Sequence, residues 1–305
     1  MLIRHLHYFT TLAREGHFAK AAQACNISQP ALSSALRKLE SDFGARLIDR
    51  DHSFLGLTPE GKRVLLWAQQ ILLDFESLKL DLTDRAADLQ GTLRIGVVPA
   101  ATALVGLLVE YFLSAHPNAA IDFQETSSRQ IQTGLDSLEL HGGLTYLDNE
   151  PLQRVLTFPV FVERDVVLAA RGHFTSEKPV SWRQLAREPL CLLNRDMQNR
   201  RILDAAARRH RVALSPGITA NSFLALSTLV QRGGWVSVVP ETLLGRLGAP
   251  EDFDVRPIAN DTNRHAIGLV VPDRQPMSKL TRAVFSAVFN SDIAQAFDAE
   301  QTPTQ

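Results

Sequence analysis

Residues 18–40, FAKAAQACNISQPALSSALRKLE, decide the fold of the N-terminal part of the chain, because they predict two helices joined by a tight turn. Asn26 tolerates the left-handed conformation that ends a helix. Ser28 is a favourable N-cap for the second helix, and Pro30 lies in its first turn, where a missing N–H costs nothing. Apolar residues of the second helix recur at steps of four, three and four, so we expect one buried face made of Leu32, Leu36, Leu39 and Phe43.

The opposite face of this second helix carries short polar side chains near its N-terminus and cations further along. A helix-turn-helix protein has this distribution, because the N-terminal end of its recognition helix meets base edges while cations meet phosphates. A solvated amphipathic hairpin would show the same periodicity, so the pattern alone leaves both interpretations open. The predicted DNA-contacting residues of this segment are Ser28, Gln29, Pro30, Ser33, Ser34, Arg37 and Lys38.

The flanking sequence completes a small domain. Residues 3–13 predict an opening helix that packs on the helical pair. Short apolar segments at residues 47–48 and 55–57 predict a two-stranded wing. Arg50 and His52 of this wing would lie along DNA, or else they are ordinary solvated loop residues.

A long helix should follow, because Thr58, Pro59 and Glu60 combine an N-cap, a proline in the first turn and an acid near the helix start. Its four-three apolar alternation persists to about Leu89, further than packing on one small domain requires. We therefore predict a partner helix and a dimer, with a helix lying on its own downstream domain as the alternative. The predicted dimerisation residues are Val64, Ala68, Ile71, Phe75, Leu78 and Leu82.

From Thr92 onwards strands and helices alternate, which predicts α/β architecture with parallel sheets in two lobes. Crossings at residues 155–170 and near Arg264 would join the lobes and permit hinge closure around a ligand. The expected division is a DNA-binding domain over residues 1–58, a linker helix over 59–90 and a ligand-binding domain over 91–305. Its first lobe would hold about residues 91–162 and 267–297, and its second about 163–266.

Ligands of open α/β sheets bind beyond the carboxyl ends of strands, where helix N-termini offer free N–H groups. Polar, uncharged loops follow the predicted strands, which favours a small anionic ligand, although the same residue types also serve as simple N-caps. Arg200 and Arg201 would pair with a carboxylate or lie at a surface helix start. The predicted ligand-binding residues are Thr102, Thr126, Ser128, Thr145, Gln198, Asn199, Asn221 and Ser222.

Composition narrows the class of protein. The 305 residues are 45% apolar and 21% charged, with a net charge of −1, so affinity for nucleic acid requires a local basic patch. Residues 1–58 hold seven Lys or Arg against five Asp or Glu, a modest net of +2. Two distant cysteines, Cys25 and Cys191, suit a reducing compartment. No stretch is long and apolar enough to span a membrane, so we expect a cytoplasmic protein without a membrane partner.

Sequence motifs of enzymes are missing: there is no GxSxG elbow, P-loop, HExxH or GxGxxG. The histidines have no spacing typical of metal ligands. Neither catalysis, a metal nor a cofactor is therefore predicted.

The segments SQPALS, LRKLE, GARLIDR and LTPEG, all between Ser28 and Gly61, resemble the N-terminal domain of LysR-type transcriptional regulators. The resemblance implies a winged helix-turn-helix, a coiled-coil linker helix and a two-lobed effector domain similar to a periplasmic binding protein. It implies double-stranded DNA, a small effector and further copies of the chain, as dimer or tetramer, as partners. DMQNRRILD at residues 196–204 also resembles regulators near formate dehydrogenase genes. The alternatives are a small-molecule-binding protein and a DNA-architectural protein without an effector.

Overall fold

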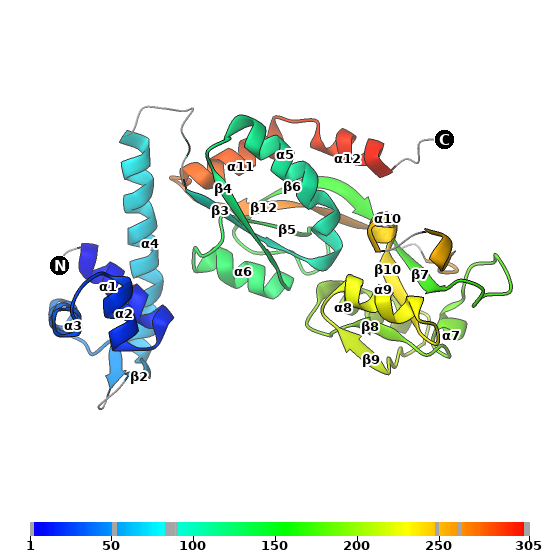
Figure 1. The fold of residues 1–305 in the computed structure, drawn as a ribbon, viewed down its shortest axis with the longest axis horizontal. Coiled ribbons are helices and arrows are strands. Elements are labelled where there is room, and N and C mark those ends of the chain that lie inside the picture. Colours follow the sequence, from blue (N-terminus) through cyan, green and yellow to red (C-terminus); the bar gives the residue numbers. More distant parts are fainter. Residues whose placement is uncertain are drawn as a thin grey trace. The chain divides into compact units, whose positions relative to one another are not determined.

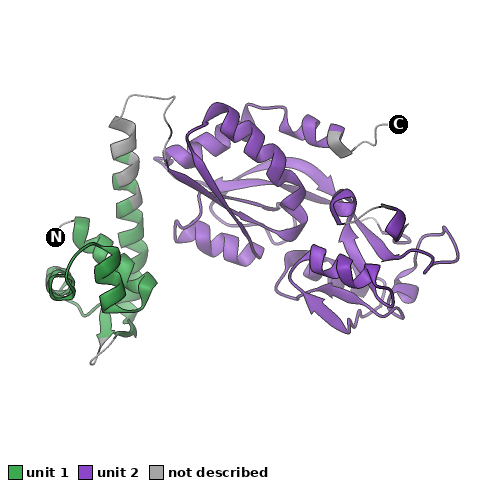
Figure 2. Cartoon of the chain, in the orientation of Figure 1, with its two compact units in different colours: residues 1–85 green, residues 86–305 purple. Residues whose placement is uncertain are grey.

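The computed structural model describes residues 3–50, 54–82, 89, 91–247, 250–261 and 264–301. The chain forms two compact units, residues 1–85 and 86–305 (Figure 2). Each unit buries its own apolar core. Among the described residues no helix has the length and apolar character needed to cross a membrane.

The core of the first unit is built from α1 (Ile3–Glu15), α2 (Phe18–Ala24) and α3 (Gln29–Phe43), which pack on one another (Figure 1). Apolar residues recur at helical spacing along them, so each helix turns one side inward. The predicted opening helix and helical pair are therefore confirmed. The buried residues of the three helices include Leu6, Phe9, Leu12, Ala21, Ala22, Leu32, Leu36 and Leu39.

Local capping sets the ends of α2 and α3. Asn26 has a φ of 54°, the left-handed conformation that follows the end of α2. The Ser28 hydroxyl accepts the Ala31 N–H at 3.4 Å, and Gly44 closes α3 with a φ of 62°. Phe43 was expected in the core but is 43% exposed, because α3 ends there and Gly44 redirects the chain.

A two-stranded wing follows α3. β1 (Ile48–Arg50) and β2 (Phe54–Leu57) pair antiparallel, as the apolar segments predicted. Ile48 is fully buried and ties the wing to the core of the first unit. The predicted DNA contacts in the wing, His52 and the side chain of Arg50, lie outside the described residues.

The N-terminal half of the long helix α4 (Pro59–Leu82) packs on the core of its own unit. Ala68 is 1% exposed, and Val64 and Ile71 are partly buried against the core formed with α1. Ala68 is therefore taken up by the core of its own unit, whereas Val64 and Ile71 pack against that core and their place in a dimer interface stays a prediction. The cause is that α1, α2 and α3 leave one side of their core open, and the beginning of α4 closes it.

α4 also carries large apolar side chains that are exposed to solvent. The helix has 24 residues, which span about 36 Å at 1.5 Å per residue. Phe75 is partly buried, while Leu78 is 55% exposed. Leu66 and Trp67 are 53% and 70% exposed. The side chain of Leu82, the last predicted dimerisation residue, lies outside the described residues.

The first lobe of the second unit is a five-stranded sheet of order β4-β3-β5-β12-β6. β3 pairs parallel with β4 and β5, whereas β12 runs antiparallel to β5 and β6. The strands are β3 (Thr92–Val97), β4 (Ala120–Glu125), β5 (Gly142–Tyr146), β6 (Val155–Glu163) and β12 (His265–Pro272). The helical segments are η1 (Pro99–Leu104), α5 (Val105–Ala115), α6 (Ser128–Asp136), α11 (Lys279–Phe289) and α12 (Ile293–Gln301).

The second lobe contains an antiparallel sheet of order β10-β7-β11 and the parallel pair β8-β9. Its strands are β7 (Asp165–Ala170), β8 (Cys191–Leu193), β9 (Ile218–Ala220), β10 (Val236–Pro240) and β11 (Phe253–Pro257). Its helical segments are α7 (Trp182–Leu185), α8 (Gln198–Arg209), α9 (Phe223–Gln231), η2 (Glu241–Leu243), α10 (Leu244–Leu247) and η3 (Pro250–Asp252).

The chain crosses between the lobes twice. β6 passes directly into β7 with only Arg164 between them, and the chain returns between β11 and β12. The prediction of parallel sheets holds for β3, β4 and β5 and for β8 and β9, and is corrected for β12 and β7, which pair antiparallel with their neighbours. The reason is that a crossing strand and its return run in opposite directions, which alternation of strands and helices does not reveal.

Candidate functional site

The outer face of α3 carries the polar and basic side chains that the sequence predicts to contact DNA. The leucines of α3 lie in the core of the first unit, so the polar side of the helix is turned outward. Lys38 pairs with Asp42 at 3.2 Å, an exposed contact that contributes little to stability. The predicted DNA-contacting residues Ser28, Gln29, Pro30, Ser34, Arg37 and Lys38 are exposed, and Ser33 is partly buried.

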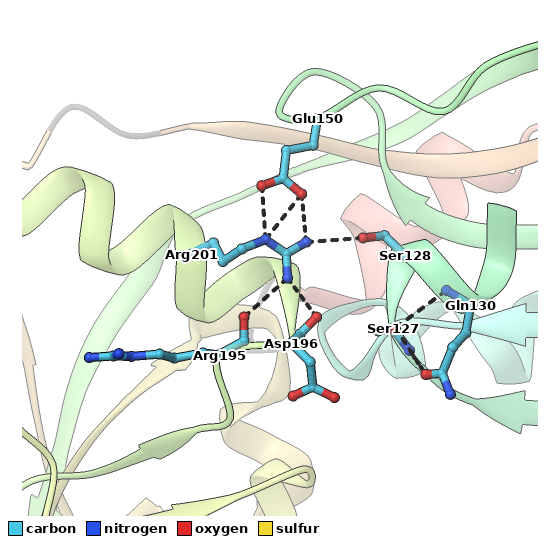
Figure 3. A network of polar contacts seen from close by, with 7 residues as sticks. All are labelled: Ser127, Ser128, Gln130, Glu150, Arg195, Asp196 and Arg201. Carbon is cyan, nitrogen blue, oxygen red and sulfur yellow. Dashed lines mark hydrogen bonds and ion pairs between the residues drawn. The ribbon is translucent and has the colours of Figure 1, made fainter. Parts of the chain in front are cut away.

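The second unit brings residues of its two lobes together at Arg201, in the first turns of α8. The Nε of Arg201 donates to both carboxylate oxygens of Glu150, at 2.8 and 3.1 Å, and Nη2 donates to one of them at 2.5 Å (Figure 3). Nη1 donates to the backbone oxygens of Arg195 and Asp196. Nη2 also lies 3.5 Å from the Ser128 hydroxyl at the start of α6. The guanidinium of the second lobe therefore holds a carboxylate of the first.

Asn199, the next-but-one residue before Arg201, makes a second contact between the lobes. Its Nδ2 donates to the Tyr146 hydroxyl and to Asp165 Oδ1, both at 3.1 Å. Burial raises the pKa of Asp165 to about 6 and raises the pKa of Tyr146 well above its usual range. Both groups are thereby favoured in their neutral forms relative to free side chains.

Two polar side chains near these contacts are buried without a hydrogen-bond partner. Gln198, the first residue of α8, is 2% exposed, and neither of its amide atoms is bonded. Thr145, adjacent to Tyr146 in β5, is fully buried with an unpaired hydroxyl. Such groups are costly to bury and mark places where a further partner would be stabilising.

Other predicted ligand-binding residues are engaged locally. The Thr102 hydroxyl donates to the Pro99 backbone oxygen at 2.9 Å, and the Thr126 hydroxyl donates to Gln130 at 2.7 Å. Asn221 is exposed, and Ser222 occupies the N-cap position of α9 without a side-chain capping bond. The structure thus brings Ser128 and Asn199 into the contacts between the lobes, with Thr145 and Gln198 adjacent in sequence.

The two arginines of α8 have different roles. Arg200 is 1% exposed and bonds Asp204 and the Leu193 backbone oxygen, so it stabilises the second lobe from inside. The expectation of a surface helix start is wrong for it, because its side chain points into the lobe. The predicted pairing with a carboxylate is observed for Arg200, with Asp204, and also for Arg201. Its partner Glu150 was not foreseen, since the two residues are 51 positions apart and Glu150 lies in an unpatterned loop.

The first crossing between the lobes carries charged residues that sequence analysis also missed. Burial raises the pKa of Glu163 to about 8, although its carboxylate accepts bonds from Thr242 and from the backbone of Arg164. Arg164 pairs with Glu241. The run Glu163-Arg164-Asp165 interrupts an apolar stretch, and this break in the pattern could have identified the three residues from the sequence. A pocket of about 270 Å³ adjoins the crossing, and its charged lining is Arg164, Asp165, Glu241, Asp261 and Arg264.

Within the described ranges no group of three or more His, Cys, Asp or Glu side chains is placed to hold a metal ion.

Comparison with known proteins agrees with this architecture. Residues 3–62 match the family "Bacterial regulatory helix-turn-helix protein, lysR family", and residues 86–290 match the "LysR substrate binding domain". YnfL of Escherichia coli, an uncharacterised HTH-type transcriptional regulator, is 32% identical over 248 residues, 78% of this chain and 82% of YnfL. The hydrogen peroxide-inducible genes activator of Haemophilus influenzae is 25% identical over 299 residues, 94% of this chain and 96% of that protein.

Solved structures share the fold over almost the whole chain. A full-length OxyR variant from Pseudomonas aeruginosa superimposes with a TM-score of 0.74 at 23% identity, covering 96% of this chain and 99% of that one. Full-length CbnR in complex with its target DNA gives 0.68 at 20% identity, covering 95% and 99%. With an exposed polar helix-turn-helix and a two-lobed ligand-binding domain, this chain belongs to the LysR family of DNA-binding transcriptional regulators.

Proposed function

We propose that α3 is the recognition helix of this regulator and lies in the major groove of its operator. The observation that carries the proposal is the outward polar face of α3, whose orientation is held by the buried Leu32, Leu36 and Leu39. Ser33 and Ser34, near the N-terminal end, are placed for base edges or phosphates, and Arg37 and Lys38 for phosphates or guanine. The complex of CbnR with its target DNA supports this use of the fold.

A dimer held by α4 would set the spacing of two such helices. Trp67 and Leu78 are eleven residues apart, close to three helical turns, so they lie on the same side of α4. Both are more than half exposed. Large apolar residues exposed in line on one helix favour association with a second helix. Trp67 and Leu78 are therefore the proposed contacts of this dimer, and sedimentation velocity distinguishes a dimer from a tetramer.

The effector of this regulator is proposed to be a small anion that binds between the lobes. Arg201, Ser128 and the first turn of α8 supply the cation, hydroxyl and N–H groups that an anion requires. Binding that favours one arrangement of the lobes would shift the population of the regulator between states with different DNA affinity. A cytoplasmic location follows from the proposed DNA target.

The proposed function includes neither a formate dehydrogenase target nor a response to peroxide. No relative described above is named for formate dehydrogenase genes, so that subgroup has no support. A peroxide response does not transfer from the relatives' names either. Burial raises the pKa of the Cys191 thiol to about 11, which leaves almost no reactive thiolate at neutral pH.

A mobility-shift titration with duplex DNA from upstream of the protein's own gene tests the proposal. We expect a specific complex that survives competitor DNA and weakens steeply with salt. Binding indifferent to salt, or equally strong to unrelated duplexes, would favour a small-molecule-binding or DNA-architectural protein instead. A screen of small carboxylates for a rise in melting temperature tests the effector part independently.

A further inference from the structure

The contact between Glu150 and Arg201 joins the lobes at the place where the proposed effector binds. Glu150 lies in the loop between β5 and β6 of the first lobe, and Arg201 lies on α8 of the second. The carboxylate of Glu150 accepts hydrogen bonds from Nε and Nη2 of Arg201 in a bidentate arrangement (Figure 3). An arginine fork binds a carboxylate in this way whether it comes from the protein or from a ligand. We call the Arg201 guanidinium and the Ser128 hydroxyl together the carboxylate subsite.

The surroundings of the carboxylate subsite suit a ligand. Met197, the N-cap of α8, offers no side-chain oxygen and makes no capping hydrogen bond. Gln198 in the same turn is 2% exposed and has both amide atoms unbonded. At the start of α6, by contrast, Ser127 and Gln130 satisfy one another in a capping box. The unmet hydrogen-bonding capacity therefore lies on the α8 side, one helical turn from Arg201.

The Glu150–Arg201 pair has the features of a replaceable contact. The Glu150 side chain is 42% exposed, and ion pairs with such exposure contribute little net stability because water screens them. Glu150 also has a φ of 55°, in the left-handed region that is unfavourable for residues other than glycine, asparagine and aspartate. Arg201, which is 18% exposed, is held by two backbone oxygens and would stay in place if Glu150 left.

We propose that Glu150 is an internal occupant of the carboxylate subsite and that the effector is a small carboxylic acid that displaces it. The proposal rests on the proposed effector function and names the ligand class. The ligand carboxylate would take the place of Glu150 on Arg201, and a second hydrogen-bonding group on the ligand would reach the Gln198 amide. Displacement of Glu150 breaks one contact between the lobes and puts a contact through the ligand in its place. Ligand binding is thereby coupled to the relative position of the two lobes.

Chemical rescue tests the carboxylate subsite without knowledge of the natural effector. Glu150→Ala in the full chain removes the internal carboxylate and leaves Arg201 in place. Acetate should then raise the melting temperature of the variant, with an apparent affinity several-fold higher than for the wild-type chain, the order expected when a half-exposed competing ion pair is removed. Acetamide, and chloride at matched ionic strength, should have no such effect.

Two further variants make the result specific. Arg201→Gln added to Glu150→Ala should abolish the acetate response. Glu177→Gln removes the acid of another Glu–Arg pair, the one with Arg256, and should respond to acetate as the wild type does. An equal acetate response in the wild type, Glu150→Ala and the double variant would overturn the proposal.

A milder substitution covers the case in which Glu150→Ala does not fold. Glu150→Gln keeps the size of the side chain, and the Nε–H proton resonance of Arg201 should move with acetate further than in the wild type. A resonance that does not respond in this variant would also overturn the proposal.

Failure of the proposed function is measured separately. DNA binding with no acetate rescue counts against the role of Glu150 alone. If acetate stabilises Glu150→Ala but no small carboxylate stabilises the wild-type chain, the proposed effector class is wrong. If DNA binding does not depend on salt, the proposed function as a regulator is wrong.

Discussion

Individual side chains on α3 determine how strongly and how selectively this regulator holds DNA. Arg37 is exposed on the polar side of the helix, in its central part. Arg37→Ala should weaken operator binding about tenfold and, if Arg37 touches phosphate, reduce the slope of log affinity against log salt by roughly one. A mobility-shift titration at several salt concentrations measures both quantities.

The control for Arg37 is Arg14→Ala, which removes another exposed arginine of the same unit, at the end of α1. We expect this variant to bind DNA as the wild type does. An equal loss in both variants would mean that general positive charge, and not the α3 face, governs binding.

Burial of Glu163 should make the stability of the second unit depend on pH. Its pKa is raised to about 8 in the folded chain, above the usual carboxyl value of 4.5. Between these values the folded state binds more protons than the unfolded state, so this residue lowers the stability as pH rises from about 4.5 to about 8. Glu163→Gln should therefore reduce the fall in melting temperature between pH 6 and pH 8.

Glu177→Gln provides the comparison for this pH experiment, because the Glu177 side chain is 91% exposed. Its melting temperature should follow the wild-type pH dependence. If Glu163→Gln also follows it, then Glu163 is ionised in the folded chain and the burial argument fails.

At the scale of elements, the wing and α4 meet at a glycine. A Cβ on Gly61 would lie 1.9 Å from the Leu47 backbone oxygen, which no rotamer change relieves. Gly61→Ala should therefore destabilise the first unit by about 1–3 kcal/mol, as overpacking of a tight contact does. Denaturant unfolding followed by circular dichroism gives the change.

Gly106→Ala is the matched glycine substitution. Gly106 lies in α5, and a Cβ there would meet nothing within 4 Å. The added methyl should leave stability unchanged or raise it slightly, because alanine favours helix over glycine. Destabilisation of similar size in both variants would contradict the close approach of α4 to the wing.

The exposed side of α4 predicts the oligomeric state. Leu78→Asp places a charge where the proposed partner helix packs, so it should convert dimers to monomers in sedimentation velocity at micromolar concentration. Lys62→Asp, also a change to aspartate at an exposed position of α4, should leave the dimer intact. A dimer that persists in Leu78→Asp would move the interface away from α4.

For the whole molecule, two units with separate cores imply that reading DNA and holding a ligand are separable. Ser33→Ala removes a hydroxyl from the α3 face and should lower operator affinity by several-fold. The melting of residues 86–305, and any stabilisation that a carboxylate confers on it, should stay as in the wild type. Loss of both properties together would argue against independent modules, and calorimetry alongside mobility shift separates them.

Features of the fold that depend on interactions between nearby residues were predictable from the sequence, and those that depend on distant contacts were less so. The helical pair, the wing and the two lobes were anticipated, and of the predicted ligand residues Ser128 and Asn199 do lie in the contacts between the lobes. Thr102 and Thr126 proved to be bonded within their own turns, because hydroxyls near helix starts satisfy local backbone and side-chain groups first. Polar residue type alone cannot distinguish these two outcomes.

The sequence by itself determined where α2 ends and where α3 begins and ends, because Asn26, Ser28 and Gly44 act on backbone groups only a few residues away. Only the tertiary structure decided which side of α4 is left for a partner and which carboxylate Arg201 holds. These choices depend on which surfaces the other elements leave open, and a periodic pattern along one helix carries no information about them. Local hydrogen bonds are set by neighbouring residues, whereas contacts between distant segments exist only once the chain has folded.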